Sequence, residues 1–336
     1  MSKRYRAVLA MRPSLPERLF TAATRQRLRD LLDIDVEHCL DTFDGDRADR
    51  ALAEAQILVT GWGSPRLGPQ VLARAPQLAA VAHAGGSVKP YLDAACWARG
   101  IAVCTAASVN ALPVAEYTLA MILLAGKGAF QVTRLYQQRR APVDLLDEFP
   151  RIGNYRRRVG IVGASRIGRR VIDLLRAFDV AVAVHDPYLD DAGARDLGVQ
   201  SLSLDELMCW SEVLSLHAPA IPETRHMIDA RRLALLPDGA TLINTARGSL
   251  VDQDALVAEL TTGRLAAVLD VTVPEVLPAD SPLYHLPNVV LTPHLAGAMG
   301  NELHRLGDWV ADEVERFVQG RPFAAPVRVE DLDRMA

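Results

Sequence analysis

Short apolar runs alternate with helix-prone segments along most of the chain. In the first third, four runs are continuously apolar, a pattern that favours strands buried on both faces of a sheet: 5–10, 57–60, 78–82 and 101–104. The segments 16–32 and 69–75, which lie between these runs, predict helices. This alternation is typical of an α/β unit with parallel strands.

A second series of the same kind begins at residue 158. It follows a long apolar-rich helix predicted at 110–126 and a stretch at 137–158 whose Arg, Pro and Asp content predicts a loop or a surface arm. Further helices are predicted at 167–178 and 301–319. Strands are predicted at 158–162, 180–185, 213–217, 241–244, 266–270 and 289–292. The two series together predict two doubly wound, parallel-sheet (Rossmann-like) domains with a cleft between them.

The composition is that of a globular protein and excludes several classes of function. Of the 336 residues, 50% are hydrophobic and 23% are charged, which suffices for two buried cores and excludes intrinsic disorder. The 41 acidic and 37 basic residues give a net charge of −4. Because positive charge is not in excess, we expect no nucleic-acid partner.

The cysteines and the apolar runs bear on the cellular compartment. The four cysteines contain no CxxC pair and are too few for a disulfide framework, so we expect a reducing compartment and no metal site. The first apolar run, at 7–11, is too short for a signal-peptide core, and no apolar run reaches the ~18 residues of a membrane span. We therefore expect a cytoplasmic protein without a membrane partner.

A buried strand runs into a glycine turn and the start of a helix at the sequence VGIVGASRIG. The N–H groups and positive dipole of such a helix N-terminus, which begins here with Arg166 and Ile167, favour binding of a pyrophosphate. Gly163 is predicted to make the tight turn, and Gly168 to let the helix pack closely on the strand. Ser165 replaces the middle glycine of the GxGxxG pattern. Its Cβ is expected to push the pyrophosphate slightly outward, while its hydroxyl offers a hydrogen bond.

An acidic residue follows the next predicted strand, at a sequence separation from the glycine turn that is typical of dinucleotide sites. Asp186 lies 23 residues after Gly163, close to the ~20 residues expected of the acidic ribose ligand in a dinucleotide site. A carboxylate there accepts from the ribose hydroxyls and repels a 2′-phosphate, which favours NAD over NADP. The alternative is a glycine turn without a ligand and an Asp that caps a loop.

Three later strands each end in a motif with one ionisable residue. Arg247 lies in NTARG, Glu275 in DVTVPE and His294 in TPHLAG. The carboxyl ends of parallel strands meet at one edge, where doubly wound sheets bind their ligands. Taken singly, each residue also fits a structural role, as a packed histidine, a turn arginine or a surface glutamate.

Taken together, these motifs resemble those of the D-2-hydroxyacid dehydrogenase family. The resemblance includes the sequence VAE in the long helix, the sequence LHAP that contains His217, and the spacings of 28 residues from Arg247 to Glu275 and 19 residues from Glu275 to His294. These features occur in the same order as in the family and span most of the chain.

The resemblance implies a catalytic set of Arg247, Glu275 and His294 and NAD as the cofactor. Reduction of a 2-oxo acid adds a hydride to the carbonyl carbon, and His294 can donate the proton that the developing alkoxide needs. Glu275 is expected to orient the imidazole and to favour its charged form, and Arg247 to bind the carboxylate and carbonyl oxygen of the substrate. The resemblance also implies that Asp270 holds the nicotinamide carboxamide and that His217 belongs to the cofactor site.

One loop of the first series departs from the family pattern. The strand at 78–82 leads into HAGGSVKP, where the family has a turn whose backbone N–H groups hold the substrate carboxylate. The resemblance assigns that role to Gly85, Gly86, Ser87 and Val88. Lys89 stands where the family commonly has an Asp. Either Lys89 points to water, or its charge favours a substrate with a second anionic group, such as a dicarboxylate or a phosphonate.

The resemblance also implies how the chain is divided. The substrate domain is expected to be discontinuous, formed by 1–108 and 301–336, and the NAD-binding domain to span 109–300. The family is typically dimeric through the cofactor domain, so we expect a homodimer with 119–124 and the arm 137–158 as contact elements.

The sequence thus predicts an NAD-dependent dehydrogenase of a small 2-oxo or D-2-hydroxy acid. Formate dehydrogenase shares the fold, but its site has an amide where this chain has Glu275. Two alternatives stay open. Phosphite or phosphonate oxidation uses the same Arg–Glu–His set, and some relatives are non-catalytic corepressors or scaffolds that sense NAD.

Overall fold

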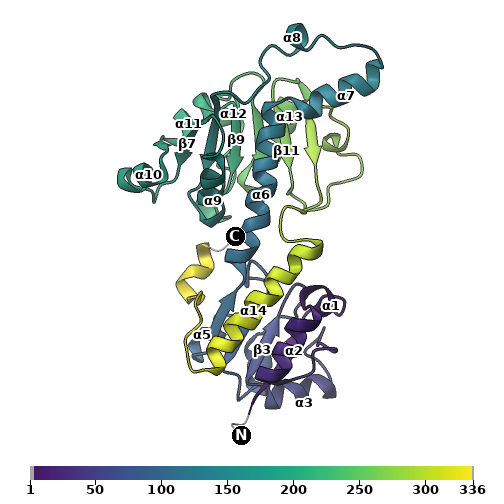
Figure 1. Ribbon diagram of the computed structural model, residues 1–336, viewed down its shortest axis with the longest axis vertical. Helices are drawn as coiled ribbons and strands as arrows, with labels where there is room; N and C mark the ends of the chain where they lie inside the picture. The colour runs from purple at the N-terminus through teal and green to yellow at the C-terminus, as the bar shows by residue number, and fades with distance from the viewer. Residues whose placement is uncertain (1–3, 335–336) are drawn as a thin grey trace. The chain divides into compact units, whose positions relative to one another are not determined.

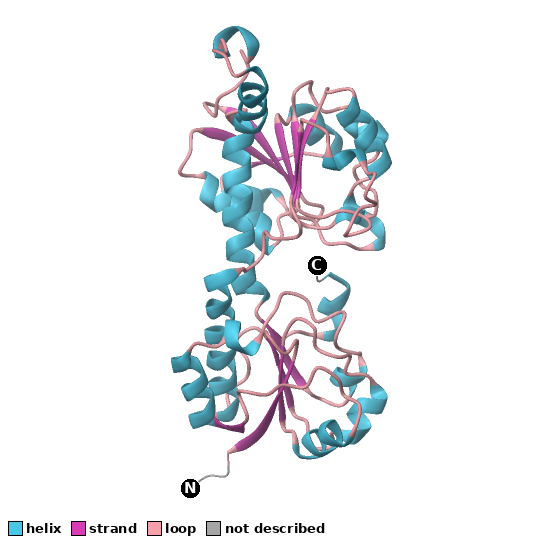
Figure 2. Ribbon diagram, turned by 90° about the vertical axis from the view of Figure 1, so that its right-hand side faces the viewer, coloured by secondary structure: helices cyan, strands magenta, loops and turns pink. Residues whose placement is uncertain are grey.

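The computed structural model describes residues 4–334, which form two compact units. The first unit contains the residues up to Asn110 and those from Ala298 onward, and the second contains Ala111–Gly297. Figure 2 shows each sheet with helices packed on both of its faces. The predicted class, α/β with two doubly wound parallel sheets, is therefore confirmed.

The first unit is built on a five-stranded parallel sheet with the order β2-β1-β3-β4-β5, one of the two common doubly wound orders. Its strands are β1 (Tyr5–Ala10), β2 (Leu32–Ile34), β3 (Ile57–Thr60), β4 (Ala80–His83) and β5 (Ala102–Thr105). Its helices are α1 (Pro16–Leu19), α2 (Ala22–Leu31), α3 (Asp46–Glu54), α4 (Pro69–Arg74), α5 (Ala95–Ala98) and α14 (Leu303–Val318). In Figure 1, α2 and α14 lie side by side over one face of this sheet.

Several predicted boundaries in the first unit were wrong. The single helix predicted at 16–32 is two helices and the short strand β2, because Phe20 is extended and Thr21 caps α2 by accepting from Thr24 N. The strands predicted at 78–82 and 101–104 end one residue later. The last helix begins at Leu303, after a 3₁₀ turn at Gly300–Glu302, and not at residue 301.

The second unit contains a seven-stranded parallel sheet with the order β8-β7-β6-β9-β10-β11-β12. The strands are β6 (Arg157–Val162), β7 (Val180–His185), β8 (Gln200–Ser201), β9 (Val213–Leu216), β10 (Thr241–Asn244), β11 (Ala266–Leu269) and β12 (Val289–Leu291). The chain runs outward from β6 to β8 and then returns to the other side of β6. This reversal places the topological switch point between β6 and β9, where doubly wound sheets bind dinucleotides.

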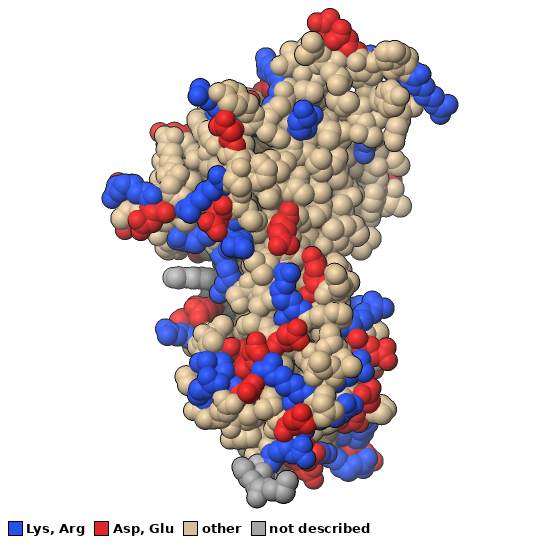
Figure 3. Space-filling view, in the orientation of Figure 1, with Lys and Arg blue, Asp and Glu red and all other residues tan. Residues whose placement is uncertain are grey.

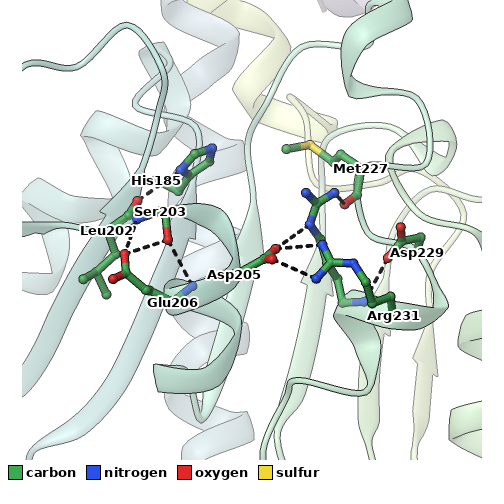
Figure 4. A network of polar contacts seen from close by, with 9 residues as sticks. His185, Leu202, Ser203, Asp205, Glu206, Met227, Asp229 and Arg231 are labelled. Carbon is green, nitrogen blue, oxygen red and sulfur yellow. Dashed lines mark hydrogen bonds and ion pairs between the residues drawn. The ribbon is translucent and has the colours of Figure 1, made fainter.

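The sheet of the second unit is covered by short helices and by one long helix. The short helices are α9 (Arg166–Leu175), α10 (Asp191–Leu197), α11 (Leu204–Trp210), α12 (Ala230–Leu233) and α13 (Gln253–Thr261). The helix predicted at 167–178 is α9, which begins one residue earlier and ends three residues earlier than predicted. Polar contacts secure α11 and α12 (Figure 4): Asp205 accepts from Arg231 and Arg232, and these two cations lower the pKa of the Asp205 carboxyl well below its usual value.

The long helix α6 (Ala107–Gly126) starts three residues before its predicted beginning and crosses the boundary between the units. Among the described residues it is the one helix that is long and apolar enough to cross a membrane. The search for uninterrupted apolar runs did not find it, because polar residues interrupt its sequence. Ala115, Ile122 and Ala125 of α6 pack with the buried strand residues Val159 and Ile161. The helix is therefore part of the core of the second unit.

The stretch predicted as a loop or surface arm is largely helical. Helix α7 (Ala129–Arg139) overlaps its beginning, and α8 (Leu145–Glu148) lies within it. Neither helix contains a buried residue, and Figures 1 and 2 show both extending away from the sheet of the second unit. The prediction of a surface arm was thus correct, but the absence of clear periodicity concealed its helices.

Candidate active site

The predicted site residues of the second unit lie along one edge of its sheet. In the spatial order of the strands, His294 follows β12, Asp270 follows β11, Arg247 follows β10, His217 follows β9 and Gly163 follows β6. Asp186 follows β7, beyond Gly163. The ionisable set and the glycine turn therefore occupy neighbouring parts of the same edge, on opposite sides of β9.

His294 and Glu275 are in direct contact. The Nδ1 atom of His294 lies 2.5 Å from Oε1 of Glu275. Because an ionised carboxylate only accepts hydrogen bonds, Nδ1 carries the hydrogen and Nε2 is left for another partner. The two side chains are 49% and 57% exposed within this chain, so a ligand can reach the imidazole.

Arg247 belongs to the same cluster. Asn244 fixes its turn, since its Oδ1 accepts from Ala246 N at 3.0 Å and its Nδ2 donates to Arg247 O at 2.9 Å. Burial lowers the pKa of the Arg247 guanidinium, whereas the charge of Glu275 acts in the opposite direction. The guanidinium, carboxylate and imidazole thus follow three adjacent strands and form one cluster of ionisable side chains.

A close backbone approach holds two of these strand ends together. A Cβ on Gly248, the residue after Arg247, would lie 2.5 Å from the carbonyl carbon of Thr272. Only glycine fits there, so the end of β10 packs directly on the loop that carries Glu275. Gln253 also fixes this loop, since its side-chain amide donates to Val273 O at 2.8 Å and accepts from Val273 N at 3.0 Å.

Asp270 organises the turn that carries His294. Its carboxylate, 2% exposed, accepts from Thr292 Oγ1 at 2.6 Å, Leu295 N at 2.8 Å and Ala296 N at 3.0 Å. His294 has a φ of +55°, in the left-handed region that non-glycine residues rarely adopt. The buried carboxylate thus stabilises an unusual backbone conformation at the candidate acid.

The glycine turn after β6 has the geometry of a phosphate cradle. Gly163 has a φ of +98°, and a Cβ on Gly168 would lie 2.0 Å from Gly163 O, so helix α9 packs directly on the turn. Ser165 is the N-cap of α9, and its hydroxyl accepts from Gly168 N at 3.3 Å. Within the described chain, the N–H groups of Ser165, Arg166 and Ile167 have no hydrogen-bond partner. Three free donors at the start of a ten-residue helix fit a pyrophosphate.

Asp186 is attached to the same turn. One carboxylate oxygen accepts from Ala164 N at 2.7 Å and the other from Tyr188 N at 2.8 Å. Because each oxygen has a second lone pair, the carboxylate keeps the capacity to accept from a ribose hydroxyl.

His217 lies beneath the glycine turn and is buried. Its Nε2 pairs with Ser215 Oγ at 2.9 Å, while its buried Nδ1 has no partner in the described chain. Burial lowers the pKa of His217 to about 3, so the ring is neutral at physiological pH. A Cβ on Gly163 would come within 2.9 Å of the His217 carbonyl carbon, which shows how closely this residue supports the turn.

The predicted carboxylate-binding turn lies in the first unit, directly after β4. Within the described residues, the N–H groups of Gly85, Gly86, Ser87 and Val88 form no hydrogen bond. Such a run of free donors can bind an anion. Lys89 is partly buried. Two further residues were not predicted because neither lies in a recognisable motif: Thr105, whose hydroxyl contacts this turn, and Gln253, which fixes the loop that carries Glu275.

The family model that describes the D-isomer-specific 2-hydroxyacid dehydrogenase NAD-binding domain matches residues 119–296. The chain belongs to the D-isomer-specific 2-hydroxyacid dehydrogenase family. The matched region contains the glycine turn, Asp186 and the cluster of Arg247, Glu275 and His294, so the chain includes the NAD-binding domain of the family and NAD is its cofactor.

Relatives and solved structures extend the similarity beyond this domain. D-3-phosphoglycerate dehydrogenase of Mycobacterium tuberculosis is 36% identical over 282 residues, which cover 84% of this chain and 52% of the relative. The (S)-sulfolactate dehydrogenase of Chromohalobacter salexigens is 34% identical over 83% of this chain and 91% of its own. The crystal structure of the TT0316 protein from Thermus thermophilus, 30% identical, has a TM-score of 0.77 over 96% of this chain and all of its own. The chain spans about half the length of the phosphoglycerate dehydrogenases that it matches.

Proposed function

We propose that the protein interconverts a small 2-oxo acid and its D-2-hydroxy acid, with NAD as the hydride carrier. The observation that carries this proposal is the contact between His294 Nδ1 and Glu275, beside Arg247 and on the same sheet edge as the glycine turn. This arrangement places an acid–base group and a cation within the NAD-binding domain itself.

The residues of the glycine turn fit NAD. The free N–H groups at the start of α9 would hold the pyrophosphate, and Asp186 would accept from the adenosine ribose, which favours NAD over NADP. When bound, the nicotinamide supplies or accepts the hydride. His217 and Asp270 are proposed to border its nicotinamide end. Asp270 already accepts three hydrogen bonds, so contact with the carboxamide would be an additional role.

His294 is proposed as the acid and base of the reaction. With Nδ1 held by Glu275, Nε2 can donate a proton to the alkoxide oxygen during reduction and accept it during oxidation. Glu275 keeps the ring in this tautomer and stabilises the positive charge that the ring carries before donation. Arg247 provides two parallel N–H donors for the substrate carboxylate and carbonyl oxygen, which polarises the carbonyl bond.

The turn at Gly85–Val88 is proposed to bind the substrate carboxylate through its free N–H groups. The substrate itself is to be identified by assay. The names of the relatives refer to hydroxy acids with a phosphate or sulfonate group, and Lys89 would suit a second anionic group of this kind. Substrates with one and with two anionic groups therefore belong in the same test.

The test is a panel of 2-oxo acids assayed by the loss of NADH. It includes glyoxylate, pyruvate, hydroxypyruvate, branched and aromatic 2-oxo acids, oxaloacetate and phosphonopyruvate, with phosphite assayed in the oxidative direction. We expect turnover with at least one 2-oxo acid and formation of the D product. NADH binding without turnover of any compound would identify an NAD sensor instead, and turnover of phosphite alone would identify an inorganic substrate.

We further propose that the protein is a cytoplasmic homodimer whose arm binds a second copy of the chain. Helices α7 and α8 contain no buried residue, and large apolar side chains are exposed on and beside them: Leu124, Tyr136, Leu145, Leu146 and Tyr155. Figure 3 shows few charged side chains over α6 on the visible face of the second unit, in contrast to the mixed charges of the first unit. Light scattering should give twice the chain mass, and Leu146→Asp should weaken the dimer. A monomeric wild-type protein would refute this assignment.

A further inference from the structure

Two carbonyl groups of the turn after β4 converge on one side chain. The Oγ1 atom of Thr105, the last residue of β5, lies 2.6 Å from Gly85 O and 2.7 Å from Gly86 O. Thr105 is 6% exposed, so water does not compete for this hydroxyl. The two carbonyls share the single hydrogen of this hydroxyl, and in the part of the chain that the structure describes no other group donates to either of them.

This contact determines where the N–H groups of the turn point. In a trans peptide the C=O and N–H bonds point in opposite directions. The carbonyl of Gly85 shares its peptide plane with the N–H of Gly86, and the carbonyl of Gly86 shares its plane with the N–H of Ser87. Because both carbonyls face Thr105, both N–H groups face away from it.

The turn needs such an anchor because its own sequence does not restrain it. Two adjacent glycines can rotate their peptide planes more freely than other residues. A Cβ on Gly85 would lie 2.6 Å from Nε2 of the buried His83, so a less flexible residue cannot replace this glycine without displacing that ring. The Thr105 hydroxyl supplies a restraint on this flexible turn from outside its own sequence.

We propose that Thr105 is a positioning residue that aims the N–H groups of Gly86 and Ser87 at the substrate carboxylate. This inference rests on the proposed function of the turn. The inference goes beyond that function because it assigns the orientation of the Gly86 and Ser87 N–H groups to the Thr105 hydroxyl, which itself does not touch the substrate. The competing view is that Thr105 only stabilises the end of β5.

Three variants separate these views. Thr105→Val keeps the branched shape and removes the hydroxyl, whereas Thr105→Ser keeps the hydroxyl. Thr24→Val is the matched control, since Thr24 is also buried in the first unit and its hydroxyl donates to Asp308, away from the turn. Thermal unfolding of all variants identifies any general loss of stability.

The first measurement needs no substrate. Residual dipolar couplings report the orientation of the Gly86 and Ser87 amide N–H bonds in the ligand-free protein. We expect Thr105→Val to change both couplings, and Thr105→Ser and Thr24→Val to leave them at wild-type values. Unchanged couplings in a folded Thr105→Val protein would overturn the proposal, whatever reaction the enzyme catalyses.

The second measurement is the binding of oxamate, an unreactive analogue of a 2-oxo acid, to the NADH complex. We expect Thr105→Val to weaken oxamate binding and raise KM for the 2-oxo acid at least about tenfold, equivalent to about 1.4 kcal/mol, with a smaller change in kcat. Thr105→Ser should restore binding to within about threefold. If Thr105→Val lowers the unfolding temperature but binds oxamate normally, Thr105 is only structural. If the wild-type protein neither binds oxamate nor reduces any 2-oxo acid, the proposed function fails, and the dipolar couplings still decide the role of Thr105.

Discussion

Gly168→Ala should disrupt the dinucleotide site through a single methyl group. In the present structure a Cβ at this position would lie 2.0 Å from Gly163 O, and real Cβ contacts are essentially never shorter than 3.0 Å. The helix and the turn must therefore separate by at least 1.0 Å, the difference between these two distances. Because the obstacle is backbone, no side-chain rotation relieves the clash.

This displacement has a calculable consequence for NAD binding. The three free N–H groups of Ser165, Arg166 and Ile167 lie between Gly163 and Gly168 and would move relative to one another. A hydrogen bond to a charged group contributes about 1.5–3 kcal/mol, so losing one such bond to the pyrophosphate lowers affinity roughly ten- to a hundredfold. Overpacking of this kind also destabilises a protein by about 1–3 kcal/mol, partly offset by the higher helix propensity of alanine. We expect NADH affinity to fall by about ten- to a hundredfold and the unfolding temperature to fall by a few degrees.

The assay is fluorescence titration with NADH, accompanied by thermal unfolding without ligand. Gly68→Ala is the matched control, since a Cβ there would meet nothing within 4 Å and its φ of −94° suits alanine. This variant should bind NADH like the wild type. Wild-type affinity in the Gly168→Ala protein would refute the conclusion that this turn binds the cofactor.

Three further predictions test other parts of the site. Asp186→Ala should lower the ratio of kcat/KM for NADH to kcat/KM for NADPH. An unchanged ratio would contradict the proposed contact between Asp186 and the ribose. Asp270→Asn leaves an amide NH₂ facing a backbone donor, so the free energy of unfolding in urea should fall by about 2–3 kcal/mol. The kcat of this variant should also be lower. A free energy of unfolding equal to that of the wild type would contradict the role of the carboxylate in the His294 turn. Burial lowers the pKa of His83 and His217 from 6.5 to about 3. Below pH 6.5 these histidines therefore bind protons in the unfolded chain but stay neutral in the folded chain. The free energy of unfolding consequently decreases as the pH falls below 6.5, by up to about 1.4 kcal/mol per pH unit for each histidine. Urea unfolding of His217→Gln should show a smaller pH dependence than the wild type, and an identical dependence would contradict this account.

The strands could be predicted because they are buried on both faces. Residues such as Val59 and Ile161 lie in continuous apolar runs that only a central parallel strand requires. The ends of β4 and β5 were missed because each is a buried polar residue, His83 or Thr105. His83, for example, is fully buried although it is polar. A hydrogen bond between its Nδ1 and Thr60 Oγ1, at 2.9 Å, explains its place, and no local pattern predicts this contact.

The charged cluster could be predicted because each of its members follows a strand end. The parallel order of β10, β11 and β12 was enough to bring Arg247, Glu275 and His294 to one edge. The contacts that hold this cluster in place were not predictable. Gln253 reaches Val273, in the loop that carries Glu275, across 20 residues of sequence. In the first unit, Thr105 reaches Gly85 of the carboxylate-binding turn across the same separation. Such side-chain to backbone contacts depend on tertiary packing and have no signature in the sequence.

The central claim is that His294 is the proton donor in an NADH-dependent reduction. The most direct test compares kcat of the wild type and His294→Gln with the best 2-oxo acid of the panel, while NADH affinity is measured in parallel. The account predicts a loss of kcat of about 10²–10⁴-fold with NADH affinity within about twofold of the wild type. Retention of most of the turnover by His294→Gln would contradict it.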